Sequence, residues 1–572
     1  IAGYLDLTQP ADQHLIERMT RTLEHRGPDG EGYYLDGPLA LGHRRLSIID
    51  LAGGKQPMAD DSGRYRISFN GEIYNFPALR EQLQKQGHSF ATRSDTETIL
   101  AAYKHYGADC VDHLRGMFAF AIWDSVEQNL FLARDRVGKK PLYYYYDGQR
   151  FIFASEIKAI IQHPAVAREI DPQAMADYFT YNYIPFPRTI FRSVKKLLPA
   201  HRALLSVRER DLNLSISEYW DLHYAPEPDV PEGEWCEALR EKFADATRLR
   251  LISDVPLGAF LSGGVDSSAV VAYMAEAQSA PVKTFSIGFK EEDFSETSYA
   301  RQVAAQFGTD HHEFIVEPDA MEMLPKLAWE YDEPFADSSA IPTWYVSKLA
   351  REHVTVILSG DGGDETFAGY RRYLWAADMH RYDRLPEPLK KLLFGLPSAL
   401  LPEGMKGKGM LRHLSHSPFE RYAGLNTFGE TPYLDRLFHA DLKSQLQGDF
   451  RQTYPDFSLM RHYYDHCNVD DYLTRIQYLD TKIYLAEDIL TKVDRASMLC
   501  SLETRAPLLD HEVLELAARI PAAAKIAGGE TKAIMKKALQ PVLPDNILYR
   551  KKMGFGVPLV HWFKKDLVSY AH

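Results

Sequence analysis

The stretch FLSGGVDSSAVVAYM, from Phe260 to Met274, decides the fold of the larger part of the chain. An apolar run ends at Leu261, a turn rich in serine and glycine follows, and the next residues predict a helix. Such a turn directs backbone N–H groups and the positive end of a helix dipole toward a bound anion. It lacks the lysine of a mononucleotide P-loop, so we expect another kind of phosphate site. The simpler alternative is a glycine turn with a serine helix cap.

The segments around this turn alternate between strand and helix patterns. Buried strands are predicted over 255–261, 283–289 and 354–360, and helices over 234–252, 267–277 and 299–308. This alternation predicts a parallel sheet with helices on both faces. Ligands of such sheets bind outside the carboxyl ends of the strands, which here are Leu261, Gly288 and Ser359.

The chain before about Ser206 has a different pattern. Short β-type runs separated by glycines are interrupted by helical patterns over 11–26 and 94–107, which predicts an α+β domain built on antiparallel sheets. A connector rich in proline and acidic residues covers 224–233. We therefore predict a first domain over 1–206, a linker over 207–232, and an α/β domain over 233–572.

Composition narrows the class of protein. The 572 residues carry a formal net charge of -13, which disfavours wholesale binding to nucleic acid. The sequence has no apolar run long enough to span a bilayer and no signal segment at its start. The four cysteines, at 110, 236, 467 and 500, show no CxxC spacing, as expected of a reducing compartment. We expect a cytoplasmic protein that binds neither nucleic acid nor membrane.

Two further motifs suggest chemistry on phosphates. After the strand ending near Leu358, a glycine-rich turn gathers Asp361, Asp364 and Glu365, which suits a metal site better than a self-repelling surface loop. Asp266 would repel phosphate unless a divalent cation lay between them, so a magnesium nucleotide is the expected ligand. The cations of residues 549–558 could neutralise transferring phosphates, although solvated charge runs are common.

LSGGVDSS (261–268), LSGDGGDE (358–365) with FAGY (367–370), and RKKMGFGVP (550–558) resemble the synthetase domain of glutamine-dependent asparagine synthetases. The first motif is similar to the pyrophosphate loop of the wider ATP-pyrophosphatase group, which splits ATP between the α- and β-phosphates. The resemblance implies magnesium at Asp266 and Asp364, and catalytic roles for Asp361 and Lys552. Asparagine synthetases often have glutamate where Asp361 stands, which leaves the acceptor open. The ATP-binding residues implied are Leu261, Ser262, Gly263, Gly264, Asp266, Ser267, Ser268, Ile287, Ser359 and Gly360.

The motifs HRGPDG (25–30), RRLSIIDL (44–51), FNGEIYN (69–75), SDTETIL (94–100) and RDRVGKKPLYY (134–144) resemble a class II glutaminase domain of the amino-terminal-nucleophile type. The glutamine-binding residues implied are Arg45, Leu46, Ser47, Ile48, Ile49, Asn70, Gly71, Glu72 and Asp95. Arg45 would pair with the substrate carboxylate and Glu72 and Asp95 with its ammonium. Asn70 and the Gly71 amide, the implied catalytic pair, would form an oxyanion hole. Taken alone, Asn70-Gly71 reads as a hairpin turn and Asp95 as a helix cap.

The family begins Cys-Gly-Ile-Ala-Gly, and its cysteine is the nucleophile. Here the sequence reads Ile1-Ala2-Gly3, so the expected cysteine falls two residues before Ile1, outside the sequence. β-Lactam synthetases resemble this family and have lost glutaminase chemistry, so an ammonia-dependent synthetase is an open alternative.

The resemblance implies an amidotransferase that adenylates a carboxylate with MgATP, releases pyrophosphate, and forms an amide with ammonia from glutamine. Its partners would be glutamine, ATP and a carboxylate acceptor, with aspartate favoured, and related enzymes are often homodimers. Sugar acids, peptides or ring-closing substrates are alternative acceptors, to be distinguished by Tyr370 and residues 332–343. Asp494 and Arg495 are expected in the scaffold, near the adenylate. A tRNA-modifying enzyme and a non-catalytic regulator are the rival classes.

Overall fold

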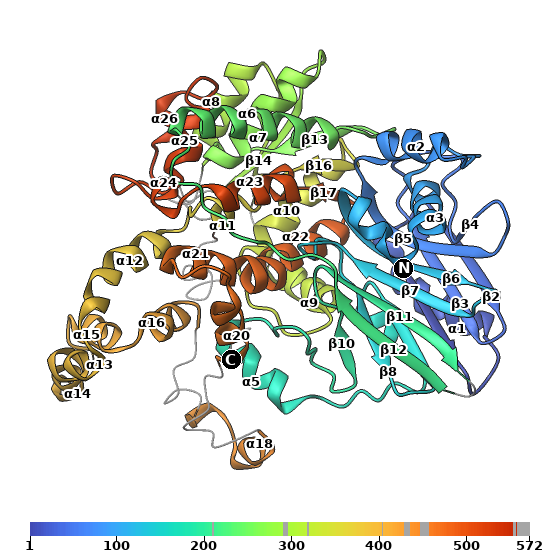
Figure 1. Cartoon of the computed structure of the whole chain (residues 1–572), viewed down its shortest axis with the longest axis horizontal. Coiled ribbons are helices and arrows are strands. Elements are labelled where there is room, and N and C mark those ends of the chain that lie inside the picture. The colour runs from blue at the N-terminus through green and yellow to red at the C-terminus, as the bar shows by residue number, and fades with distance from the viewer. Residues whose placement is uncertain are drawn as a thin grey trace.

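The computed structural model describes residues 1–208, 211–289, 296–316, 320–402, 404–427, 435–446, 457–552 and 556. The chain forms two halves that lie side by side (Figure 1). The amino-terminal half contains two six-stranded sheets whose paired strands run antiparallel, and the second half contains a five-stranded parallel sheet. The predicted α+β and α/β classes are therefore confirmed.

The two antiparallel sheets pack face to face. The first has the order β10-β8-β9-β1-β3-β2 and the second β12-β11-β7-β6-β5-β4. Their inner faces share a core that includes Leu39 and Leu41 of β3 and Trp123 of β6. The strands are β1 (Ala2–Asp6), β2 (Gly30–Asp36), β3 (Leu39–Arg45), β4 (Met58–Ala59), β5 (Tyr65–Ile73), β6 (Gly116–Asp124), β7 (Asn129–Arg134), β8 (Tyr143–Tyr146), β9 (Arg150–Ala154), β10 (Val194–Lys196), β11 (His201–Arg208) and β12 (Asp211–Glu218).

Helices cover the outer faces of these sheets. α1 (Gln13–Arg21) and α4 (Ile157–Ile160) pack on the first sheet. α2 (Phe76–Lys85) and α3 (Asp95–Tyr106) pack on the second. Apolar residues of α1 recur at helical spacing, Leu15, Ile16 and Met19, which explains why this segment forms a helix with one buried face.

The parallel sheet has the order β15-β14-β13-β16-β17. Its strands are β13 (Leu257–Phe260), β14 (Lys283–Phe289), β15 (Asp310–Val316), β16 (Val356–Leu358) and β17 (Glu503–Arg505). One face is covered by α6 (Glu232–Leu249), α7 (Val265–Ala277), α8 (Thr297–Phe307), α23 (His511–Arg519) and α25 (Ala533–Leu539). The other is covered by α9 (Ala320–Tyr331), α10 (Ala340–Arg351) and α22 (Leu490–Met498). The predicted helices on both faces are confirmed.

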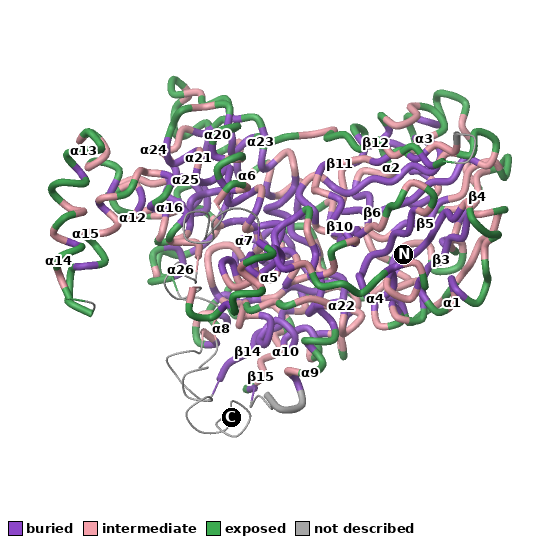
Figure 2. Tube along the Cα trace, turned by 90° about the horizontal axis from the view of Figure 1, so that it is seen from below, coloured by how far each residue is buried: buried purple, intermediate pink, exposed green. Residues whose placement is uncertain are grey.

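A helical region extends from this sheet (Figure 1). Figure 2 shows α13, α14 and α15 as a projecting, largely exposed group. The remaining elements are the short helices η1 (Glu24–Arg26), η2 (Gly107–His113), α5 (Pro172–Tyr181), α11 (Gly363–Thr366), α12 (Arg371–His380), η4 (Arg381–Arg384), α13 (Glu387–Lys390), η5 (Lys391–Gly395), α14 (Leu396–Leu400), α15 (Lys408–Ser415), α16 (Pro418–Leu425), α18 (Ala440–Gln445), α20 (Ser458–His466), α21 (Tyr472–Leu479), η6 (Asp480–Ile489), η7 (Pro507–Leu509), α24 (Ala522–Lys525) and α26 (Asp545–Leu548).

Two local features differ from the sequence reading. Asn70 and Gly71 do not form a hairpin turn, because both lie inside β5 and pair with Ala119 and Phe118 of β6. Strand β12 falls within the range predicted as linker, 207–232, yet it pairs with β11 along its length. We therefore propose a later boundary, between the end of β12 and the start of α6.

Among the described residues, no helix combines the length and the apolar character needed to cross a bilayer. All four cysteines are free thiols.

Candidate functional site

A large cavity of about 830 Å³ opens at the carboxyl ends of β13, β14 and β16. It brings together most of the residues predicted for ATP and catalysis, which come from three distant parts of the sequence. Those lining it are Leu261, Ser262, Gly264, Asp266, Ser267, Ile287, Ser359, Gly360, Asp361, Asp364 and Lys552. Gly263 and Ser268 do not line it, although both were predicted to bind ATP.

The loop between β13 and α7 owes its shape to its small residues. Gly263 has a φ of +70°, and a Cβ there would lie 2.5 Å from Cβ of Tyr299, so only glycine fits. The Ser262 hydroxyl lies 3.1 Å from that of Ser267, and the Gly264 N–H donates to it at 3.3 Å. Ser268 is fully buried in α7. The loop thus presents N–H groups and hydroxyls at the amino end of α7, as an anion site requires.

Two carboxylates converge in this cavity. Lys532 Nζ lies 2.7 Å from Asp364 Oδ1 and also contacts the carboxylate of Asp266, although these residues are far apart in sequence. Burial opposes the charge of Asp364, but Lys532 and Lys552 lower its pKa to about 2. Burial raises the pKa of Asp266, which Lys532 opposes. Two half-buried carboxylates that share one cation, here the Lys532 ammonium, fit the donor set of a magnesium site.

Asp361 and Lys552, the two residues predicted to be catalytic here, also line this cavity. The Ser359 hydroxyl donates to Asp361 Oδ2 at 2.6 Å, and burial raises the pKa of Asp361. Lys552 Nζ contacts the carboxylate of Asp364 and lies 4.4 Å from the ring centroid of Tyr370. Burial lowers the pKa of Lys552, so this amine loses its proton more easily than an exposed lysine.

The sequence reading missed other polar residues of the cavity. Lys532 is the most important, and its only sequence signal is a lysine after the glycine pair 528–529. Lys492 lines the cavity and donates to Asp337 at 2.8 Å, and Arg550 pairs with Glu296 at 2.5 Å. Tyr370 and several residues of the range 332–343, which the sequence predicted to select the acceptor, also line it. Most of the RKKMGFGVP motif after Lys552 lies outside the described residues.

A second, smaller cavity of about 60 Å³ lies in the amino-terminal half. Of the residues predicted to bind glutamine it is lined by Arg45, Leu46, Ile48, Ile49, Asn70, Gly71, Glu72 and Asp95. Ser47 is not among them, and its N–H donates to Asp29 at 2.8 Å. Ile1 lines this cavity, as do Met498 and Glu503 from the other half of the chain. The contribution from the second half was not predicted.

Backbone geometry places the polar groups of this cavity. Gly71 has a φ of +145°, and a Cβ there would lie 2.0 Å from the Met117 carbonyl oxygen, so glycine is required. Asp95 is the first residue of α3, not its cap, which is Ser94, and it accepts from the Ile73 N–H at 3.0 Å. Burial raises the pKa of Asp95 to about 6 and that of Glu72 well above its usual range. A positively charged ammonium ligand would therefore favour the ionised form of both acids.

Arg45 shapes one wall of the cavity. Its guanidinium donates to the carbonyl oxygens of Ile49, Asp50 and Leu51 at 3.1, 2.7 and 2.9 Å. These bonds fold residues 46–51 into a loop around the side chain. The predicted pairing with a substrate carboxylate would share a guanidinium that already organises this loop.

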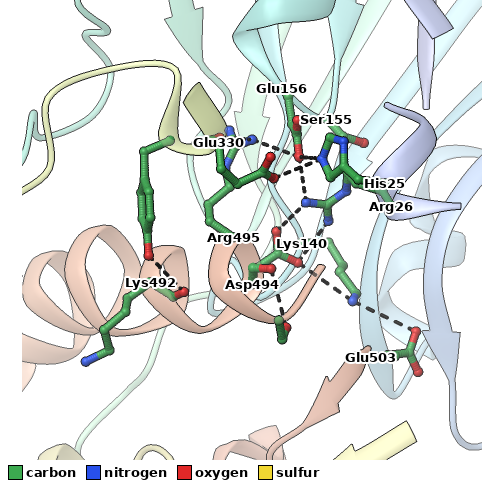
Figure 3. Close-up of polar contacts among 12 residues, drawn as sticks. His25, Arg26, Lys140, Ser155, Glu156, Glu330, Lys492, Asp494, Arg495 and Glu503 are labelled. Atoms are coloured by element: carbon green, nitrogen blue, oxygen red, sulfur yellow. Dashed lines mark hydrogen bonds and ion pairs between the residues drawn. The ribbon is translucent and has the colours of Figure 1, made fainter. Parts of the chain in front are cut away.

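A buried charge network joins the two halves (Figure 3). Arg26 pairs with both oxygens of Asp494 at 2.8 and 2.9 Å, and Arg495 pairs with Glu156 at 2.9 Å. His25 contacts Glu156 at 3.2 Å and Glu330 at 2.9 Å. Asp494 and Arg495, expected near the adenylate, thus direct their charged groups toward the amino-terminal half. Because arginine, lysine and histidine already neutralise Glu156, this cluster is an ion-pair network and not a metal centre.

Comparison with known proteins gives a family match for each half of the chain. Residues 1–220 match the family described as Glutamine amidotransferase domain, and residues 238–572 match Asparagine synthase. Asparagine synthetase (glutamine-hydrolyzing) 1 of Bacillus subtilis (strain 168) is 38% identical over 99% of this chain and 87% of that protein. Its paralogue, asparagine synthetase (glutamine-hydrolyzing) 3, is 33% identical over 97% and 86%. Amidase chyE of Penicillium rubens is 29% identical over 96% and 86%.

The fold and the two cavities thus define a two-domain amidotransferase. Within that class, the chain belongs to the asparagine synthase family.

Proposed function

We propose that the protein is a glutamine-dependent amidotransferase that converts a carboxylate into an amide at the expense of ATP, with aspartate as the favoured acceptor. The observation that carries this proposal is the convergence of Asp266, Asp364, Lys532 and Lys552 on one cavity beside the loop 261–268. Family membership and the second cavity, lined by Arg45, Glu72 and Asp95, support the use of glutamine.

The first step would take place in the large cavity. An oxygen of the acceptor carboxylate attacks the α-phosphorus of ATP, the bond from that phosphorus to the bridging oxygen breaks, and pyrophosphate leaves. The N–H groups and hydroxyls of residues 262–267 would bind the pyrophosphate. Lys552 would balance the charge that develops on the phosphates. In the second step ammonia attacks the acyl carbon, AMP leaves with the bonding electrons, and the nitrogen loses a proton.

Magnesium would be held by Asp266 and Asp364, and it would supply charge neutralisation to the phosphates. Their shared contact with Lys532 supports this assignment, because both side chains reach a common cation there.

Ammonia would pass between the halves through the interior. A small cavity of about 20 Å³ lies between the two sites. It is lined by Ser359 and Asp361, which also line the large cavity, and by Lys140 and Asp494 of the buried network. Arg26 and Glu503, which line the glutamine pocket, contact Asp494 and Lys140 respectively. A short internal route would keep ammonia from being protonated in water.

The nucleophile of the glutaminase step would be a cysteine two residues before Ile1. Ile1 lines the glutamine pocket, and two further residues of extended chain span roughly 7 Å. A chain carrying Cys-Gly ahead of Ile1 should release glutamate from glutamine, whereas Ala-Gly in the same place should not. Equal glutaminase activity of the Cys-Gly and Ala-Gly chains would contradict the assignment of this cysteine as the nucleophile and favour an ammonia-dependent synthetase.

The decisive experiment supplies the Cys-Gly chain with glutamine, ATP, magnesium and aspartate. AMP, pyrophosphate, glutamate and asparagine should appear in equal amounts, and ammonium should replace glutamine in the chain that begins at Ile1. Formation of ADP instead of AMP would overturn the mechanism. Unchanged rates on addition of RNA would exclude a tRNA-modifying enzyme.

A different acceptor is the second candidate. Asp361 is shorter than the glutamate common at this position, and one relative of the chain is named an amidase. Pyrophosphate release measured across amino acids, sugar acids and short peptides would identify the acceptor. A rate with aspartate no higher than the background would transfer the assignment to the best substrate found.

A further inference from the structure

One short strand of the parallel sheet also contributes a residue to the smaller cavity in the amino-terminal half. β17 (Glu503–Arg505) is the edge strand of the parallel sheet, where it pairs with β16. The side chain of Glu503 nevertheless lines the glutamine pocket of the other half. Because side chains alternate along a strand, Glu503 and Arg505 share one face, and that face is directed toward Glu72.

Arg505 is fully buried, and most of its guanidinium has partners. Nε donates to Glu503 Oε1 at 2.9 Å, and Nη1 donates to the carbonyl oxygens of Arg250 and Ile252 at 2.9 and 2.6 Å. Nη2 has no hydrogen-bond partner among the described residues, and it lies 3.4 Å from Glu72 Oε1. These hydrogen bonds fix the guanidinium so that Nη2 faces the carboxylate of Glu72.

The charges around Glu72 show how Arg505 Nη2 affects the ionisation of this carboxylate. Asp95 of α3 and Glu503 of β17 are acidic and buried, while Arg505, Lys140 and Arg45 supply positive charge nearby. Burial raises the pKa of Glu72, and among the charged neighbours Arg505 opposes that rise most strongly. A protonated Glu72 would lose its attraction for an ammonium group.

We propose that Arg505, a residue of the synthetase half, is a positioning residue of the glutamine pocket, whose guanidinium holds the Glu72 carboxylate toward the substrate ammonium. This inference rests on the proposed glutamine site. It means that the pocket is completed only when β17 is in place.

The backbone of Arg505 has a separate role that provides an internal control. Its carbonyl oxygen accepts the N–H of Ser359 at 2.9 Å, at the edge of the nucleotide cavity. A side-chain substitution leaves that bond intact, so glutamine binding should change while ATP binding should not.

The test is a double-mutant cycle read by calorimetric binding of glutamine to the chain Ile1–His572, which needs no turnover. Arg505→Gln should raise the glutamine Kd by about tenfold or more, since hydrogen bonds to charged groups contribute about 1.5–3 kcal/mol. Glu72→Gln should raise it by a similar factor. In the Glu72→Gln background, Arg505→Gln should add less than about twofold. Arg519→Gln, an exposed arginine paired with Glu227, is the matched control and should leave the Kd unchanged.

A pH series separates positioning from scaffolding. The affinity for glutamine should fall at acid pH in every variant that keeps Glu72, because Glu72 and Asp95 must be ionised to bind the ammonium group of glutamine. In Arg505→Gln this fall should begin at a higher pH than in the natural chain. Arg505→Lys keeps the charge and should recover part of the affinity, and it replaces Arg505→Gln in the cycle if the latter does not fold.

The outcomes are distinct. If the natural chain fails to bind glutamine, the proposed glutamine site falls, and this inference with it. If it binds glutamine and the Arg505 variants bind equally well, only the inference is overturned. An Arg505 effect of the same size in both Glu72 backgrounds, or a matching loss of ATP affinity, would show a structural role and also overturn it.

Discussion

Lys532 Nζ lies 2.7 Å from Asp364 Oδ1, and both residues line the cavity that is proposed to bind ATP. The same ammonium contacts Asp266, and its side chain is almost fully buried. Under the proposed magnesium assignment, Lys532 and the metal ion would share the same two carboxylates, so the ammonium would stabilise the cavity when no metal is bound. Removing one partner of such a buried pair costs about 3–5 kcal/mol.

Lys532→Met should therefore lower the melting temperature in metal-free buffer by roughly 3–4 °C. Magnesium should restore part of the loss, because the cation would then neutralise Asp266 and share Asp364 with Lys552. Differential scanning fluorimetry with and without magnesium measures both effects. Lys537→Met, in the helix that Lys532 caps but exposed and paired with Glu232, is the control. A loss that magnesium leaves unchanged would contradict this account.

Asp364→Asn should reduce pyrophosphate release by at least about 100-fold, because it removes a charge that the phosphate chemistry requires while keeping the side-chain shape. Release from ATP and aspartate with ammonium as donor measures it directly. Asp378→Asn, on the exposed face of α12, should behave as the natural chain. Unchanged release by Asp364→Asn would revive the interpretation as a non-catalytic nucleotide binder.

His25 should make stability depend on pH. Burial opposes its charge, but Glu156 and Glu330 raise its pKa to about 9, compared with about 6.5 in an unfolded chain. The charged His25 side chain stabilises the folded state by at most about 3 kcal/mol. This contribution is complete below pH 6.5 and is lost as the pH rises through 9. The difference in unfolding free energy between the natural chain and His25→Gln should shrink over that range. A constant difference would exclude the charged contact, and exposed His14→Gln is the control.

Gly71→Ala should destabilise the amino-terminal half by at least about 2 kcal/mol, because its φ is +145° and the new Cβ would meet the Met117 carbonyl. Glutamine binding should weaken as the pocket wall moves. Thermal unfolding and calorimetry measure the two effects. Gly233→Ala, where a Cβ meets nothing within 4 Å, should be neutral or stabilising. A stable, glutamine-binding Gly71→Ala would contradict the assigned geometry.

The fold was predictable where local pattern and architecture agree. The alternation through β13, α7, β14 and α8 was readable because apolar periodicity changes from strand to helix in each segment. The turn between β13 and α7 was predictable because its residues are contiguous in the sequence. Asn70-Gly71 misled as an isolated dipeptide, because pairing of β5 with β6 overrides its local preference for a turn.

The unpredicted part of each site comes from long-range contacts. Lys532 reaches Asp266 across 266 residues, and no periodicity or motif marks it. Glu503 lines the cavity of the amino-terminal half, and Arg505 contacts Glu72, only because β17 lies at the edge of the sheet that faces the other half. Single-sequence reasoning assigns such residues to the domain they belong to in sequence, not to the cavity they line.

The network around Arg26, Glu156, Asp494 and Arg495 has a practical consequence for anyone who wishes to divide the protein. An amino-terminal fragment that stops in the irregular segment after β12 would leave Arg26 and Glu156 facing solvent without their arginine and aspartate partners. A chimaera that joins halves from two relatives would need complementary charges on the two contacting surfaces. The residues of this network would therefore have to be taken together from one relative.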